Sequence, residues 1–135
     1  MTGDETRPPI EVAPEVADAL RARRAVVALE TAVLTHGLPR TPMAAPGAVA
    51  GWDASLPANL ALSMLLESTV RAAGAVPATV AMVDGTLHVG LAPPALARLA
   101  HDTGARKLSA RDLGPAAAAP CGHEGDGGQG GDSPR

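Results

Sequence analysis

The sequence predicts a single α/β domain, and three observations support this fold class. Residues 25–29 form a short apolar run that ends at polar residues and a Gly–Pro turn, as a fully buried strand does. Residues 59–74 carry apolar side chains at the helical period. Asp84-Gly85 separates two further apolar runs, and this dipeptide is typical of a two-residue hairpin turn because both residues tolerate positive φ. A length of 135 residues suits one domain.

Three helices are expected along the chain. The first covers residues 14–24, with Pro14 in its first turn and three arginines near its end, where they complement the helix dipole. The second covers residues 59–74, with Asn59 as its N-terminal cap and Gly74 in the left-handed position at its end. The third covers residues 93–100.

Charged and polar residues on these elements have ordinary structural interpretations. Glu67 and Arg71 lie four residues apart with the acid first, which favours a surface ion pair within the second helix. Residues 80–83 and 86–89 are the two strands of the hairpin, and His88 on the second strand is either a half-exposed structural residue or a ligand. The single tryptophan, Trp52, either anchors its loop or stacks on a ligand.

Composition excludes several function classes. The net charge of −3 argues against sequence-independent nucleic-acid binding, which needs a basic face. The only cysteine is Cys121, so no disulfide forms within the chain. No apolar run approaches the length of a membrane-spanning helix, and the first nine residues do not resemble a signal peptide. We therefore expect a cytoplasmic protein without a membrane partner.

Both ends of the chain are expected to be disordered, which leaves residues 14–113 as the folded domain. Residues 1–13 are largely polar, and residues 114–135 are rich in Ala, Gly and Pro and cannot bury enough apolar surface. Cys121 and His123 in this tail are two potential metal ligands, whereas a structural zinc site normally needs four. Residues 41–58 are rich in glycine and proline and are expected to form a long loop.

Glu30 and Lys107 are the candidate functional residues. Glu30 ends the first strand, where burial would raise the pKa of its carboxyl group and allow it to exchange a proton; a carboxylate facing water is an equal alternative. Lys107 could pair with a phosphate or carboxylate, or form a Schiff base. With Ser109, Arg111 and Asp112, it resembles an anion-binding turn.

One more side chain on the first segment is a candidate. His36, before the Gly–Pro turn, either binds a substrate or caps the turn. No nucleophile elbow, P-loop or dinucleotide-binding glycine pattern is present. The residues alone therefore predict an α/β domain with candidate site residues and leave the reaction open.

Several sequence blocks, in order, resemble the pseudouridine-5′-phosphate glycosidases, also called the indigoidine synthase A family. The blocks are ALET at 28–31, HGLP at 36–39, Asn59-Leu60, VRAAGAVPATVA at 70–81, Asp84-Gly85, VGL at 89–91 and KLSARDL at 107–113. Several blocks in one order are more specific than any one of them. The resemblance covers residues 26–113.

This resemblance implies a fold, a reaction and site residues. The fold would be the N-terminal part of the family's α/β/α sandwich. The reaction is the reversible cleavage of the C–C glycosidic bond of pseudouridine 5′-phosphate to uracil and ribose 5-phosphate, in pseudouridine catabolism. Glu30 would be the proton donor and Lys107 would bind the substrate. Family members use a divalent metal, typically manganese (Mn²⁺), and are usually homotrimers.

The chain also departs from the family pattern. Family chains are more than twice as long and carry, after the KLSARDL block, a metal-binding aspartate and a nucleophilic lysine. Here Lys107 is the only lysine, and no counterpart of that aspartate is present. Residues 41–58 interrupt the passage from the Gly–Pro turn to the second helix. We expect a truncated member that is inactive alone, with a ribose-phosphate-binding or oligomer-interaction fragment, or one half of a split enzyme, as alternatives.

Overall fold

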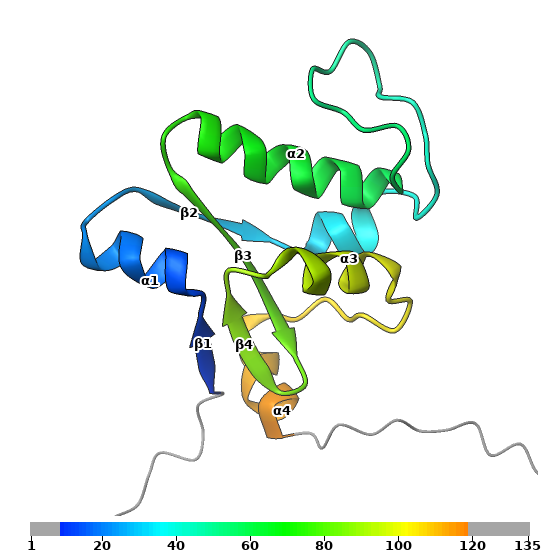
Figure 1. The fold of residues 1–135 in the computed structure, drawn as a ribbon. Coiled ribbons are helices and arrows are strands. Elements are labelled where there is room, and N and C mark those ends of the chain that lie inside the picture. Colours follow the sequence, from blue (N-terminus) through cyan, green and yellow to red (C-terminus); the bar gives the residue numbers. More distant parts are fainter. Residues whose placement is uncertain (1–8, 119–135) are drawn as a thin grey trace, which may run out of the picture.

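The structure is a computed structural model that describes residues 9–118 (Figure 1). A mixed four-stranded sheet lies at its centre, in the order β1-β4-β3-β2. The strands are β1 (Ile10–Val12), β2 (Val26–Glu30), β3 (Val76–Val83) and β4 (Thr86–Val89). β1 pairs in parallel with β4, β4 pairs antiparallel with β3, and β3 pairs in parallel with β2. The predicted α/β class is confirmed.

Helices cover both faces of this sheet. They are α1 (Pro14–Arg21), α2 (Ala58–Ala72), α3 (Pro93–His101) and α4 (Leu113–Ala118), with short helical turns at Val33–Gly37 (η1) and Ala110–Asp112 (η2). Ala78 of β3 packs with α1, whereas the neighbouring Thr79 donates a hydrogen bond to Glu67 of α2. Successive strand residues point to opposite faces, so α1 and α2 lie on opposite sides of the sheet.

The core consists of two small clusters. The first joins α1 to β3 through Val16, Ala19, Val76 and Ala78. The second joins η1, α2 and α3 through Leu34, Leu60, Leu96 and Ala100. The second cluster fixes η1, which begins three residues after Glu30 at the end of β2.

The expected disorder at the two ends is wrong where the structure describes it. Ile10–Val12 form β1, because β4 offers them a parallel pairing partner that the sequence pattern does not reveal. Leu113–Ala118 form α4, since the alanine-rich start of the tail has a high helix propensity. Residues 1–8 and 119–135, including Cys121 and His123, lie outside the described residues.

The first strand was expected to be buried, and this is also wrong. β2 lies at one edge of the sheet, where Val27 is 40% exposed. Its partner β3 begins at Val76, four residues before the expected start, because Val76–Val80 pair in parallel with Val26–Glu30. The first helix ends at Arg21, since Arg23 adopts a positive φ of 55°.

The long loop predicted at residues 41–58 is present up to Pro57, since α2 begins at Ala58, and a bridge between Pro42 and Pro57 closes its base. Figure 1 shows the loop projecting beyond the N-terminal end of α2. Trp52 donates a hydrogen bond from Nε1 to the carbonyl oxygen of Met43 at 2.9 Å and is partly buried, which agrees with an anchoring role. Among the described residues, no helix has the length and apolar character needed to cross a membrane.

Candidate functional site

The site begins where β2 ends. Thr31 donates a hydrogen bond from Oγ1 to the carbonyl oxygen of Val80, at 3.2 Å, which ties the end of β2 to β3. Thr35 then donates from both its amide and its hydroxyl to the carbonyl oxygen of Thr31, at 3.0 Å each. These bonds fix the turn that follows Glu30 and therefore the direction in which Glu30 leaves the strand.

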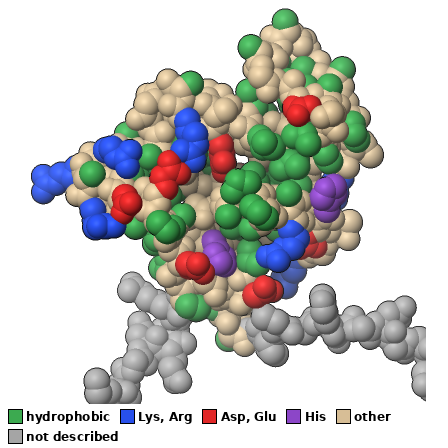
Figure 2. All heavy atoms as spheres, in the orientation of Figure 1, with side chains coloured by type: hydrophobic (Ala, Val, Ile, Leu, Met, Phe, Trp, Pro, Cys, Tyr) green, Lys and Arg blue, Asp and Glu red, His purple; other side chains and the backbone are tan. Residues whose placement is uncertain are grey.

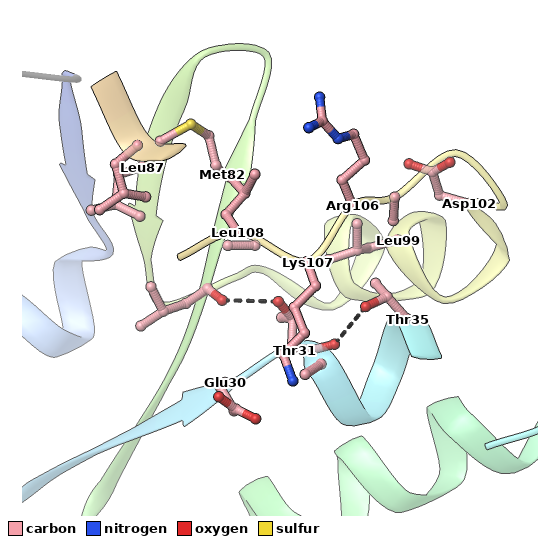
Figure 3. Close-up of a pocket in the computed structure, with 15 residues that line it drawn as sticks. Glu30, Thr31, Thr35, Met82, Leu87, Leu99, Asp102, Arg106, Lys107 and Leu108 are labelled. Carbon is pink, nitrogen blue, oxygen red and sulfur yellow. Dashed lines mark hydrogen bonds between the residues drawn. The ribbon is translucent and has the colours of Figure 1, made fainter. Parts of the chain in front are cut away.

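A cavity of about 260 Å³ opens beside this turn, between β2, the β3–β4 hairpin and residues 105–108 (Figure 3). Its polar lining combines two acids, two bases and two hydroxyls: Glu30, Asp102, Arg106, Lys107, Thr31 and Thr35. Its apolar lining includes Val80, Met82, Leu87, Leu99 and Leu108. The charges balance, and a polar ligand with an anionic group would find hydrogen-bond donors here.

The two candidate residues from the sequence, Glu30 and Lys107, line this one cavity although they are distant in the chain. Figure 3 shows the Lys107 amino group extending toward the side of the cavity where Glu30 lies. Both side chains are exposed, and no ion pair joins them within the described part of the chain. Of the two alternatives that the sequence left open for Glu30, the structure thus shows the exposed carboxylate and not the buried one, because β2 is an edge strand.

The expected anion-binding turn does not assemble. Only Lys107 of its four residues lines the cavity. Ser109 instead donates from its amide and its hydroxyl to Asp112, at 2.7 and 2.6 Å, and so caps η2. Both hydrogen bonds lower the pKa of Asp112, and the bond from the Ser109 hydroxyl contributes more than the bond from its amide. Arg106 joins Lys107 in the cavity lining and was missed, although its basic character next to Lys107 was a signal.

The two histidine candidates lie outside the cavity lining. His36 is exposed, and its Nδ1 lies 2.7 Å from the hydroxyl of Thr35, so it contributes to the turn. His88 lies on β4, with its Nδ1 3.6 Å from a carboxylate oxygen of Glu11 on β1. A partly exposed residue beside a neighbouring strand fits the structural interpretation of His88.

A second cavity of about 450 Å³ is lined by residues of α1, α2 and β4, among them Glu15, Glu67, Arg71 and His88. Figure 2 shows acidic, basic and histidine side chains close together on one face of the molecule. The predicted ion pair between Glu67 and Arg71 is wrong. Arg71 binds Glu15 of α1 instead, and Glu67 accepts a hydrogen bond from Thr79 at 2.5 Å.

The predicted cap of α2 is also wrong. Pro57 occupies the cap position, and the Asn59 side chain is buried.

The residues of the first cavity do not by themselves fit a manganese site. Its carboxylates are those of Glu30 and Asp102. Across the residues that the structure describes, no group of three His, Cys, Asp or Glu side chains is close enough to hold a metal ion. Manganese favours a larger set of oxygen or nitrogen ligands, so further ligands would have to come from another segment.

Comparison with known proteins decides the family. The family model described as "Indigoidine synthase A like protein" matches residues 15–130. The chain belongs to this family. The family resemblance predicted from the sequence blocks is therefore confirmed.

Relatives within the family carry a common name. A protein from Salinispora tropica named pseudouridine-5′-phosphate glycosidase is 50% identical over 104 residues, or 77% of this chain and 27% of the relative. A protein of the same name from Streptomyces griseus is 46% identical over 105 residues, covering 78% of this chain and 28% of the relative. This chain thus spans less than a third of the length of these two relatives.

A solved structure of the family has the same fold. The prealnumycin C-glycosynthase AlnA, in complex with ribulose 5-phosphate, superposes with a TM-score of 0.60 at 38% identity. The match covers 82% of this chain and 30% of AlnA. The arrangement of sheet and helices described above is therefore that of one part of the larger indigoidine synthase A-like fold.

Proposed function

We propose that this chain forms one part of a pseudouridine-5′-phosphate glycosidase site. Glu30 is the proton donor, and Lys107 binds the substrate, pseudouridine 5′-phosphate. The products are uracil and ribose 5-phosphate. The observation that supports this proposal is that Glu30 and Lys107 line one cavity. The chain that carries them is 38% identical to a C-glycosynthase solved with ribulose 5-phosphate.

The chemistry explains why these two residue types are needed together. When the bond between the sugar and the uracil carbon breaks, that carbon must receive a proton, and a carboxylic acid at the cavity edge can deliver it. Lys107 and Arg106 add two positively charged side chains to the lining of the same cavity, and these can bind a phosphate dianion. The two ends of the substrate would therefore be recognised by different chain segments.

A second lysine and a metal complete the proposed reaction from outside the described cavity. A carbon–carbon bond to a sugar breaks more easily when the opened sugar is held as an imine, which serves as an electron sink. Lys107 is the only lysine in the chain and is assigned to substrate binding, so the imine-forming lysine must belong to another segment. The same holds for ligands of the family's manganese ion.

The proposal predicts binding without turnover for this chain alone. With pseudouridine 5′-phosphate and manganese, it should release no uracil above background, measured by chromatography. Calorimetry should detect binding of ribose 5-phosphate, and Lys107→Ala should weaken that binding at least ~10-fold, the scale of one charge-assisted hydrogen bond. Arg98→Ala is the matched control, because Arg98 lines only the second cavity. Turnover by the chain alone, or equal binding by Lys107→Ala, would refute these assignments.

A non-catalytic ribose-phosphate-binding module is the alternative. It is favoured by the basic side chains of Arg106 and Lys107 in the cavity lining, which can bind a phosphate group without any catalytic step. A chimera in which this chain replaces the matched 104 residues of the Salinispora relative separates the two functions. Uracil release by the chimera supports the enzyme part, whereas ribose 5-phosphate binding without release supports the binding module.

Location and assembly are part of the same proposal. A doubly charged nucleotide does not cross membranes unaided, so an enzyme acting on it is expected in the cytoplasm. We also propose the homotrimer of the family for the complete fold. Light scattering of the chimera measures this directly, and a monomer would contradict it.

A further inference from the structure

Two side chains connect the segment that follows Glu30 with the segment that precedes Lys107. Asn59 of α2 donates from Nδ2 to the carbonyl oxygens of Leu34 and Ala100, at 2.7 and 2.8 Å. Arg40 donates from Nη2 to the carbonyl oxygens of Thr35 and Asp102, at 2.8 and 2.9 Å. Each side chain thus holds one carbonyl of η1 and one carbonyl at the end of α3.

These four carbonyl groups lie next to the two candidate site residues in the chain. Leu34 and Thr35 belong to η1, and hydrogen bonds from Thr35 to Thr31 connect η1 to the residue after Glu30. The other two carbonyls are at the end of α3, where the last carbonyl groups have no partner within the helix. The chain then runs directly into residues 105–108, which line the cavity and include Lys107.

We propose that Asn59 and Arg40 are positioning residues that set the separation between Glu30 and Lys107. This inference rests on the roles proposed above for Glu30 and Lys107. Asn59 and Arg40 are not in the cavity lining, so they act through the backbone of η1 and of the α3 end. Two parallel bridges resist both separation and rotation of the two segments, which one bridge alone would not do.

Buried polar atoms in these two side chains argue for a geometric role. The Asn59 side chain is 0% exposed, and its Oδ1 has no hydrogen-bond partner in the described part of the chain. Nε of Arg40 is likewise buried there without a partner. Buried polar atoms without partners cost stability, so an apolar side chain would serve a core better. What Asn59 and Arg40 supply is a fixed distance between two backbone segments.

The test compares Arg40→Ala with a variant that is destabilised elsewhere. Val16→Ala is the control, because Val16 packs in the α1 cluster and is not in the lining of the Glu30–Lys107 cavity. In Arg40→Ala, amide hydrogen exchange should accelerate ~10-fold or more at residues 31–37 and 102–108 but not in the β3–β4 hairpin. The dissociation constant for ribose 5-phosphate should rise at least ~10-fold. Arg40→Lys, which keeps the charge and one donor group, should give intermediate values. Val16→Ala should leave the dissociation constant unchanged.

These measurements test the positioning role of Asn59 and Arg40 independently of the proposed binding function. Faster exchange across the whole chain, or equal loss of affinity in Val16→Ala, would overturn the positioning role. If the unchanged chain does not bind ribose 5-phosphate, the binding function fails, yet the exchange pattern still tests the two bridges. Asn59→Asp is the second variant: it replaces the shared donor by an acceptor and should accelerate exchange in the same two segments. Normal exchange there would contradict the proposal.

Discussion

Arg71 and Glu15 connect α2 to α1 by two hydrogen bonds, of 2.6 and 2.9 Å, between the guanidinium and the carboxylate. The hydrogen bond is the largest cause of a lowered pKa for Glu15 and a raised pKa for Arg71. Both side chains are 49% exposed, so solvent screens the pair. The pair therefore contributes little to the free energy of unfolding. Its main effect is to orient α1 and α2, which lie on opposite faces of the sheet.

We predict that Glu15→Gln lowers the free energy of unfolding at neutral pH by less than ~1 kcal/mol, as is usual for exposed ion pairs. The folded-state pKa of Glu15 lies below its ordinary value of 4.5, so its contribution is complete above that pH. The contribution is lost as the pH falls through the lowered pKa. Urea titrations at several pH values should show the penalty vanish in acid. Asp18→Asn, which affects a pair within α1 alone, is the control. A penalty that persists in acid would contradict this origin.

Gly90 is the position where a side chain should be tolerated least. It has a φ of +93°, and a Cβ atom there would lie 2.7 Å from Cβ of Ala13 and 3.0 Å from Cγ2 of Val16. Gly90→Ala therefore combines backbone strain with a clash against α1, and we expect a loss of roughly 2–4 kcal/mol of unfolding free energy.

Gly74 provides the matched control for this substitution. Its φ of +83° is similar, but no atom lies within 4 Å of an added Cβ. Gly74→Ala should cost only the backbone strain, about 1 kcal/mol. Thermal or urea unfolding of the two variants measures the difference, which isolates the clash. Equal losses would mean that α1 does not approach β4 as closely as the structure shows.

Leu34 should contribute most of the packing that holds η1. It is 2% exposed and packs with Leu60, Leu96 and Ala100. Leu34→Ala should lower the unfolding free energy by about 2–5 kcal/mol, as do other buried leucine truncations. Leu20→Ala, at a side chain 57% exposed on α1, should stay within about 0.5 kcal/mol. A small effect at Leu34 would show that η1 is held by its hydrogen bonds alone.

Local signals predicted the elements that depend on local structure. The Asp84-Gly85 turn is present, with positive φ at both residues, 49° and 76°. The Glu67–Arg71 pair failed because Glu15, 56 positions from Arg71, offers a two-bond partner. β1 was missed because three exposed residues carry no strand pattern, and only pairing with β4 makes them a strand.

The candidate site likewise contains residues that the sequence predicted and residues that it did not. Glu30 and Lys107 were suggested by their residue types and by family resemblance, and the structure places both at one cavity. Asn59 and Arg40 were missed as site residues because their partners are backbone carbonyls, which leave no trace in the sequence. The edge position of β2, and therefore the exposure of Glu30, depends on which strands pair, and this too is non-local.

The proton-donor role that we propose for Glu30 makes the most specific prediction for activity. In the chimera with the Salinispora relative, Glu30→Gln should reduce the rate of uracil release by ~10²–10⁴-fold, the contribution typical of a general acid. The amide preserves size and hydrogen bonding but cannot supply the proton. Because Glu30 is exposed, the variant should fold and bind ribose 5-phosphate as before, so the loss should appear in kcat rather than in KM. Glu11→Gln, at an exposed residue on β1 outside this cavity, is the control. A Glu30→Gln chimera with unchanged kcat would assign the proton transfer to another group.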